Sequence, residues 1–410
     1  MLLVVLWLTA CSPGGTTPIP TPTPTVSTPP RLAQARATVD ALVKAVEADD
    51  PSAFQALISD RDPTFAARAR LLFSNLSTLP LTELDLLVEP DEQPLSPARQ
   101  AVLGADAWTQ PVVVTWQLTG DHGQAQHRVW FTWVTEDGRA ALAGTFDGPA
   151  PAEPEQQPIW WLGPVTARVD GSATVIVGAG QPLDRWTTLV GRAADDVRRR
   201  LPDPVASGWA GRVVVEVPAA ARDFEAVLGQ PPGRYASIAA VTQVTGDAAR
   251  PATRVVVNPR ASQLVADDQL AELLRHEIVH VATRSPQSPA PLWAVEGLAE
   301  WVALDPGAGR HGPGVAAVLN DVRRNGPPAR LPVDAEFAVG ATELNQAYAE
   351  AWLACRYLVA AHSPTDLGRL YAELEAGRSL DQASRSVLGQ SERSLTAGWR
   401  RFLVEQAAER

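Results

Sequence analysis

The chain has 410 residues, enough for two or three domains, and 45% of them are hydrophobic, so a wholly disordered chain is excluded. Its 46 acidic residues outnumber its 35 basic ones, which gives a net charge of −11. This charge argues against nucleic acid as a partner and against electrostatic binding to anionic lipid, because both need a basic surface.

The first eleven residues predict a secretion signal of the lipoprotein type. Residues 2–8 read LLVVLWL, an apolar run too short to span a bilayer but suited to the core of a signal peptide. The following Leu8-Thr9-Ala10-Cys11 resembles a bacterial lipobox, although no Lys or Arg precedes the apolar run. The resemblance implies removal of residues 1–10, lipidation of Cys11, and anchoring on the outer face of a bacterial cell membrane. The alternative is a buried N-terminal strand with an incidental cysteine.

Residues 11–30 predict a linker, because their Pro- and Thr-rich composition favours an extended polyproline conformation over a packed core. Residues 31–147 then predict a small α+β domain. A helix is expected from Arg31 to Glu47 and another after Asp50-Pro51, from the helical spacing of their apolar residues. Segments whose apolar residues alternate with a period of two follow and predict strands, with an Asp137-Gly138 hairpin turn between the last two. The three strands are expected over residues 112–117, 128–134 and 142–146.

Helices followed by an antiparallel meander resemble the NTF2-like (SnoaL-like) α+β cone fold, whose members range from enzymes to non-catalytic pockets. His122 and His127 flank a predicted turn and are interpreted as surface loop histidines. A second linker is expected over residues 148–158, so that a further domain spans residues 159–410. Its first elements are predicted at Val165–Val169 (strand), Ala173–Val177 (strand), Leu183–Leu201 (helix) and Arg212–Val217 (strand).

One motif carries the chemistry of the second domain. Residues 267–283 predict a helix, with Asp267 or Asp268 as N-cap, and it contains His276-Glu277-Ile278-Val279-His280, an H-E-x-x-H sequence. Residues four apart lie on the same helix face, so two imidazoles can occupy two corners of a zinc tetrahedron. Glu277 can then take a proton from a metal-bound water. The alternative is a helix with two surface histidines beside an acid.

A second short helix is predicted over residues 291–301, PLWAVEGLAEW, and antiparallel packing would bring Glu296 to the metal. H-E-x-x-H followed by W-x-x-E-G-x-A-E resembles the gluzincin metallopeptidases, the thermolysin-like superfamily, and in particular their peptidase MA-like group. The resemblance implies a thermolysin-like domain with a small sheet and an α-helical lobe. It also implies one Zn²⁺ held by His276, His280 and Glu296, with Glu277 as general base. The connecting loop must be tighter than in thermolysin.

Two further roles are implied by the same resemblance. An acid four residues after the third ligand holds a ligand histidine through its second ring nitrogen, and Glu300 stands there. The helix predicted over 346–358 resembles the aminopeptidase segment whose tyrosine stabilises the oxyanion, which implies that role for Tyr348. A solvated carboxylate and a core tyrosine are the respective alternatives. The strand Thr253–Pro259 is expected to edge the active-site cleft, where an extended peptide could add to it.

The sequence thus predicts a lipid-anchored, extracytoplasmic zinc metallopeptidase acting on a peptide or protein substrate. No match to the amine-binding G-x-M-E-N segment of aminopeptidases is present, so endopeptidase and exopeptidase action stay open. One alternative is a non-catalytic surface lipoprotein that binds a ligand or partner through its NTF2-like domain and carries a vestigial metal domain. The intact Glu277 counts against it, because a purely structural metal site needs no base. A metal-dependent hydrolase of non-peptide substrates is the other alternative.

Overall fold

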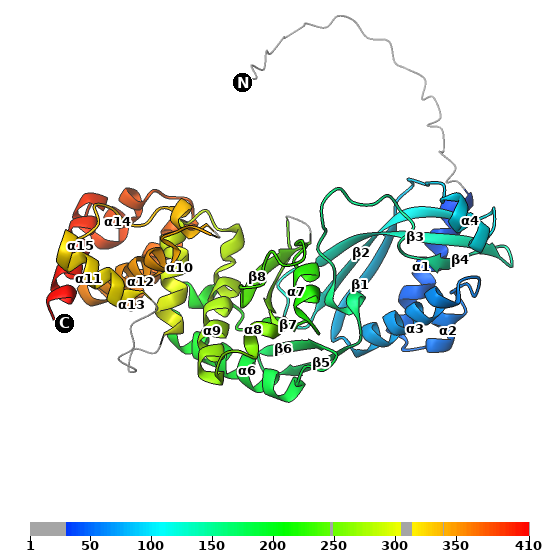
Figure 1. The fold of residues 1–410 in the computed structure, drawn as a ribbon, viewed down its shortest axis with the longest axis horizontal. Helices are drawn as coiled ribbons and strands as arrows, with labels where there is room; N and C mark the ends of the chain where they lie inside the picture. Colours follow the sequence, from blue (N-terminus) through cyan, green and yellow to red (C-terminus); the bar gives the residue numbers. More distant parts are fainter. Residues whose placement is uncertain (1–29, 247–248, 305–313, 339, 410) are drawn as a thin grey trace, which may run out of the picture.

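The computed structural model describes residues 30–246, 249–304, 314–338 and 340–409, and it has two sheets and a helical lobe (Figure 1). The predicted α+β class is confirmed. The predicted signal peptide, Cys11 and all of the predicted linker except Pro30 lie outside the described residues. Within the described ranges, no helix has both the length and the apolarity to cross a bilayer.

Three helices open the described part of the chain, and each begins at a proline: α1 (Pro30–Glu47), α2 (Pro51–Gln55) and α3 (Pro63–Thr78). The carboxylate of Asp50 accepts hydrogen bonds of 2.9 Å from the backbone N–H groups of Ser52 and Ala53. Asp62 caps α3 in the same manner. Aspartate followed by proline is a strong signal for the start of a helix. The carboxylate accepts hydrogen bonds from the unpaired backbone N–H groups of the first turn, and proline has no backbone N–H that would need an acceptor.

The first sheet is a four-stranded antiparallel meander in the order β1-β2-β3-β4, and it curls beside α1 and α3 (Figure 1). Its strands, together with the short helix α4 that precedes β2, are β1 (Leu81–Val88), α4 (Pro97–Leu103), β2 (Trp108–Leu118), β3 (Ala125–Glu136) and β4 (Arg139–Gly144). The three predicted strands correspond to β2, β3 and β4, whereas α3 and β1 have no predicted counterpart. β4 ends two residues before the predicted end at residue 146.

His127 corrects one sequence-based expectation. It lies in β3 and pairs with Val114 of β2, rather than in a loop. Its imidazole meets the ring of Trp161 nearly edge-on, with 5.9 Å between ring centroids. The prediction failed because β2 and β3 both extend further toward their connecting turn than the alternation of apolar residues indicated. His122 does lie in that turn.

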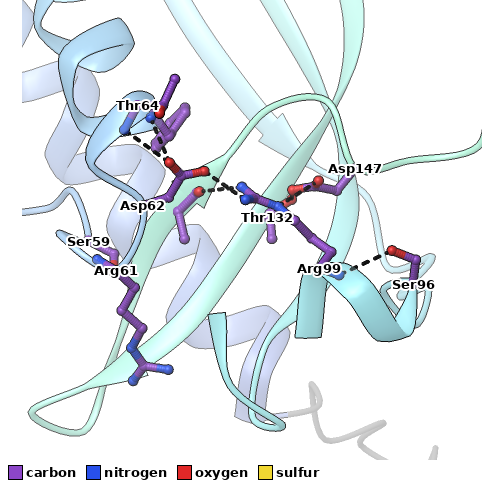
Figure 2. A network of polar contacts seen from close by, with 10 residues as sticks. Ser59, Arg61, Asp62, Thr64, Ser96, Arg99, Thr132 and Asp147 are labelled. Atoms are coloured by element: carbon purple, nitrogen blue, oxygen red, sulfur yellow. Dashed lines mark hydrogen bonds and ion pairs between the residues drawn. The ribbon is translucent and has the colours of Figure 1, made fainter. Parts of the chain in front are cut away.

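A polar network ties α3, α4 and the sheet together (Figure 2). The Arg99 guanidinium of α4 donates to Asp62 at 2.7 Å and to Asp147 at 2.8 Å. Asp147 also accepts a 2.7 Å hydrogen bond from the Thr132 hydroxyl of β3. Because Arg99 and both carboxylates are paired and mostly buried, this network stabilises the N-terminal unit and has no free group for chemistry.

The second sheet has the order β5-β6-β7-β9-β8, with parallel pairing among β6, β7 and β9 and antiparallel pairing at both ends. The strands are β5 (Val165–Asp170), β6 (Ala173–Gly178), β7 (Val213–Val217), β8 (Ala240–Thr245) and β9 (Ala252–Val257). β9 matches the strand that was expected to edge the cleft, but it is an inner strand. That expectation is wrong: the edge belongs to β8, which has no predicted counterpart.

The two faces of this second sheet belong to two different cores. Val175, Val215 and Val255 pack toward the helix α6 (Leu183–Arg200) and the helical lobe. Their neighbours Ile176 and Val256 join the core of the N-terminal unit. Successive side chains of a strand point to opposite faces, so strands buried on both sides read as continuous apolar runs. The predicted linker at 148–158 therefore does not separate two independent cores.

The C-terminal part of the chain is a lobe of helices beside the second sheet, on the side away from the first sheet (Figure 1). It consists of α9 (Asp267–Thr283), α10 (Leu292–Ala303), α11 (Val315–Asn325), α12 (Leu344–Ala361), α13 (Pro364–Glu375), α14 (Leu380–Leu388) and α15 (Glu392–Ala408). α10 and α12 approach very closely at Gly297, where an added Cβ atom would lie 2.6 Å from the carbonyl oxygen of Ala351. The shorter helices α5 (Ile159–Leu162), α7 (Ala221–Val227) and α8 (Pro259–Ser262) complete the fold.

Candidate metal centre

The H-E-x-x-H sequence lies in the second half of α9, as predicted. The helix begins after Ala266 as N-cap, so Asp267 and Asp268 are in its first turn instead of capping it. Arg275 fixes the helix in place: its guanidinium donates to the carbonyl of Ala303, at the end of α10, over 2.8 Å and lies 3.2 Å from Asp196 of α6. The half of α9 that contains His276 and His280 is thus held to both neighbouring helices.

The three predicted ligands converge on one point. The Nε2 atoms of His276 and His280 are 3.0 Å apart. Glu296, carried by α10, places its Oε2 atom 3.2 Å from Nε2 of His276 and 3.4 Å from Nε2 of His280. Among the described residues, these three side chains form the group suited to hold a metal ion.

This triangle fits zinc. In a tetrahedral site with ligand distances of about 2.0–2.1 Å, neighbouring ligand atoms lie about 3.3–3.4 Å from each other. Oε2 of Glu296 is buried and makes no hydrogen bond, although a buried carboxylate oxygen normally has a partner. Two imidazoles and one carboxylate also form a donor set that is typical of catalytic zinc sites, in which the fourth position stays open.

The site favours positive charge. Burial by itself would lower the pKa of His276, but the carboxylates of Glu296 and Glu300 outweigh burial and raise this pKa well above its usual value. Burial opposes ionisation of Glu296 as well, yet the two imidazoles lower its pKa. The buried carboxylates therefore stabilise positive charge on the two imidazoles of the metal-free triangle.

The second ring nitrogens of the two histidines have different neighbours. Nδ1 of His276 is 3.5 Å from Oε1 of Glu300, one turn after Glu296 on α10. Glu300 is thus close to Nδ1 of His276, and its orienting role stays a prediction. Nδ1 of His280 is 2.9 Å from the hydroxyl oxygen of Ser285. Ser285, which follows Arg284 at the C-terminal end of α9, has no predicted role.

Glu277 is 7% exposed and is held from the edge strand of the sheet. The hydroxyl oxygen of Thr242, on β8, is 2.7 Å from the Glu277 carboxylate and 3.0 Å from the Glu277 backbone carbonyl oxygen. Thr242 is a second residue without a predicted role. The available signal was the alternating segment Val241–Val244, which precedes β9, α8 and α9 in the chain.

Tyr348 comes to the same site from α12. Its ring centroid lies 6.2 Å from that of His276 and 5.4 Å from that of Phe337. Burial, and then the nearby carboxylates of Glu296, Glu277 and Glu300, raise the pKa of the Tyr348 phenol. A phenol that stays protonated is a hydrogen-bond donor, as its predicted role requires.

No protein-family model matches the chain, and no curated protein matches it at a significant level. The function is therefore inferred from the chain's own residues and their geometry.

Proposed function

We propose that the protein is a zinc metallopeptidase of the gluzincin type. The observation that carries this proposal is the triangle of His276, His280 and Glu296, whose sides of 3.0, 3.2 and 3.4 Å suit a tetrahedral zinc ion. The presence of Glu277 beside the first ligand, in a buried position, favours catalysis over a structural metal site. The finer fold assignments, an NTF2-like unit followed by a thermolysin-like domain, belong to the same proposal.

The side chains divide the reaction between them. Zinc, when bound, would supply a Lewis acid that activates water and polarises the scissile carbonyl. Glu277 accepts the proton of the attacking water, and Thr242 holds its carboxylate in place while it does so. Tyr348 donates its phenolic hydrogen to the oxyanion that develops on the substrate. Glu300 orients His276 through the second ring nitrogen.

The edge strand favours a peptide over a non-peptide substrate. β8 pairs with β9 on one side, and among the described residues no second strand pairs with its other edge, although Gln156 donates a hydrogen bond to the Val244 carbonyl. An extended peptide can add to such an edge as a further strand. Because Thr242 on β8 contacts Glu277, a peptide that binds there lies beside the proposed base.

The N-terminal unit does not favour the alternative of a ligand-binding lipoprotein. The cavity between its helices and sheet has a volume of about 50 Å³ and an apolar lining that includes Phe54, Phe131 and Trp160. Such a space holds a few water molecules at most, because one water needs about 10–15 Å³ by the same measure. An organic ligand would require the core to open.

The proposed location follows from the lipobox at residues 8–11 alone. Anchoring through Cys11 would place the enzyme on the outer face of the membrane, with the Pro-rich residues 12–29 as a spacer. Mass spectrometry of the protein extracted from membranes is expected to find a diacylglyceryl group on Cys11. A mature protein that begins upstream of Cys11 would refute this part of the proposal.

Metal analysis tests the proposed activity. The soluble chain from residue 12 onward should contain close to one zinc per molecule, and His276→Ala should contain almost none. His362→Ala is the matched control, because His362 is exposed and lies outside the site. A peptide library should then be cleaved by the wild type but not by Glu277→Gln, which keeps all three ligands. A folded wild type without zinc, or zinc without cleavage of any peptide, would contradict the proposal.

A further inference from the structure

His280 is held in a way that distinguishes it from His276. The helix α9 ends at Arg284, whose φ of 48° and ψ of 37° are left-handed. This conformation turns the chain back at the helix end and brings Ser285 beside His280. The Ser285 hydroxyl oxygen lies 2.9 Å from Nδ1 of His280, whereas His276 faces the carboxylate of Glu300 at 3.5 Å.

The hydrogen-bond chemistry of this contact has two possible directions. If Nδ1 of His280 donates to Ser285, its Nε2 has a free lone pair directed at the triangle. If Ser285 donates instead, Nε2 carries the hydrogen and is blocked as a metal ligand. Nε2 of His280 is 3.0 Å from Nε2 of His276 and 3.4 Å from Glu296. The hydrogen bond at the second nitrogen decides which tautomer is present.

We propose that Ser285 is the positioning residue of the second histidine ligand: it accepts the Nδ1 hydrogen of His280 and so keeps Nε2 unprotonated and aimed at the metal. This inference deepens the proposed function and rests on it. Ser285 serves His280 as Glu300 serves His276, but it is neutral. One ligand imidazole is therefore polarised by a carboxylate and the other is oriented by a hydroxyl alone.

The first test needs no metal and no substrate. Long-range ¹H–¹⁵N spectra of the metal-free protein at neutral pH are expected to show His280 protonated at Nδ1 in the wild type. Ser285→Ala should shift it toward the Nε2-protonated form, and Ser285→Thr, which keeps the hydroxyl, should not. A wild-type His280 protonated at Nε2, or an unchanged tautomer in Ser285→Ala, would overturn the proposal.

The second test measures zinc affinity by competition with a chelator. Ser285→Ala is expected to bind zinc about 10- to 100-fold more weakly, as for other outer partners of metal-bound histidines, and Ser285→Thr should stay close to the wild type. Ser288→Ala is the matched control, because it removes a hydroxyl from the same loop. Equal affinity of Ser285→Ala and the wild type would contradict the proposal. Failure of the wild type to bind zinc would instead contradict the proposed function, while the tautomer measurement still decides the role of Ser285.

Discussion

Thr242 is the contact between the edge strand and the proposed base. Its single hydroxyl lies within hydrogen-bond distance of both the carboxylate and the backbone carbonyl of Glu277, at 2.7 and 3.0 Å. A carboxylate held at one oxygen keeps the other free to face the water. Under the proposed function, strand β8 would both orient the base and offer its outer edge to the substrate.

Thr242→Val is expected to lower kcat by about tenfold or more and to leave the zinc content unchanged, because the isosteric side chain fills the same space without the hydroxyl. Turnover of the best library peptide, measured with zinc analysis of the same samples, checks this. Thr242→Ser should recover most of the activity. An unaltered kcat in Thr242→Val would show that Glu277 needs no support from β8.

The residues of the site differ in how visible they are in the sequence. His276, Glu277 and His280 can be recognised because their spacing lies within one helical turn. Glu296 and Glu300 are predicted through the resemblance of the second helix to the gluzincin pattern W-x-x-E-G-x-A-E. Thr242 and Ser285 could not be found in this way, because each reaches its partner only through the packing of β8 on α9 or the left-handed residue after α9.

At the scale of elements, the three lobe helices around the site were predictable, whereas α11 and the order of strands were not. In α9, α10 and α12, apolar residues recur at helical spacing over several turns. The positions of these three helices agree with those expected. β9 reads as a strand in the sequence, but nothing in its side chains says which neighbour it has. The resemblance placed it at the edge, whereas the sheet adds β8 outside it.

A histidine on strand β3, His127, makes the stability of the protein depend on pH. Burial lowers the pKa of His127 to about 4, although a hydrogen bond that the protonated imidazole donates to the backbone of Gln156 opposes this shift. The folded-state pKa is thus below the unfolded value near 6.5. The unfolded chain takes up the proton first as the pH falls, so stability is complete above pH 6.5 and is lost toward pH 4.

His127→Phe should remove this pH dependence of stability and still place an aromatic ring against Trp161. The wild type is expected to lose up to about 3 kcal/mol more stability than the variant between pH 6.5 and pH 4, from 1.36 kcal/mol per pKa unit. Urea unfolding at a series of pH values measures the difference. His362→Phe, at an exposed position, should leave the slope as in the wild type. Parallel pH profiles for His127→Phe and the wild type would rule this pH dependence out.

At the scale of the whole molecule, a buried ion cluster joins the two sheets. Arg254 of β9 lies 2.7 Å from Asp121, in the turn between β2 and β3, and 2.9 Å from Glu216 of β7. All three side chains are at most 5% exposed. The Arg254 guanidinium also lies over the ring of Trp116, 5.5 Å from the ring centroid. The N-terminal unit is thus tied to the strand beside β8, and the two parts should unfold in one transition.

Arg254→Met is expected to destabilise the protein by about 3–5 kcal/mol, because it leaves two carboxylates buried without their cation. Denaturant unfolding measures this free energy. Arg168→Met is a suitable comparison: Arg168 pairs with the exposed Asp184, so its loss should cost less than about 1 kcal/mol. If both variants lose the same small amount of unfolding free energy, water must reach the Arg254 cluster.

The backbone contact at Gly297 has a consequence for how the site can vary. Glu296 is carried by α10 and Tyr348 by α12, and the two helices touch where Gly297 lacks a side chain. The absence of a side chain at residue 297 therefore sets the spacing between Glu296 and Tyr348. Any side chain at this position would push the two helices apart and widen the gap between the proposed ligand and the phenol.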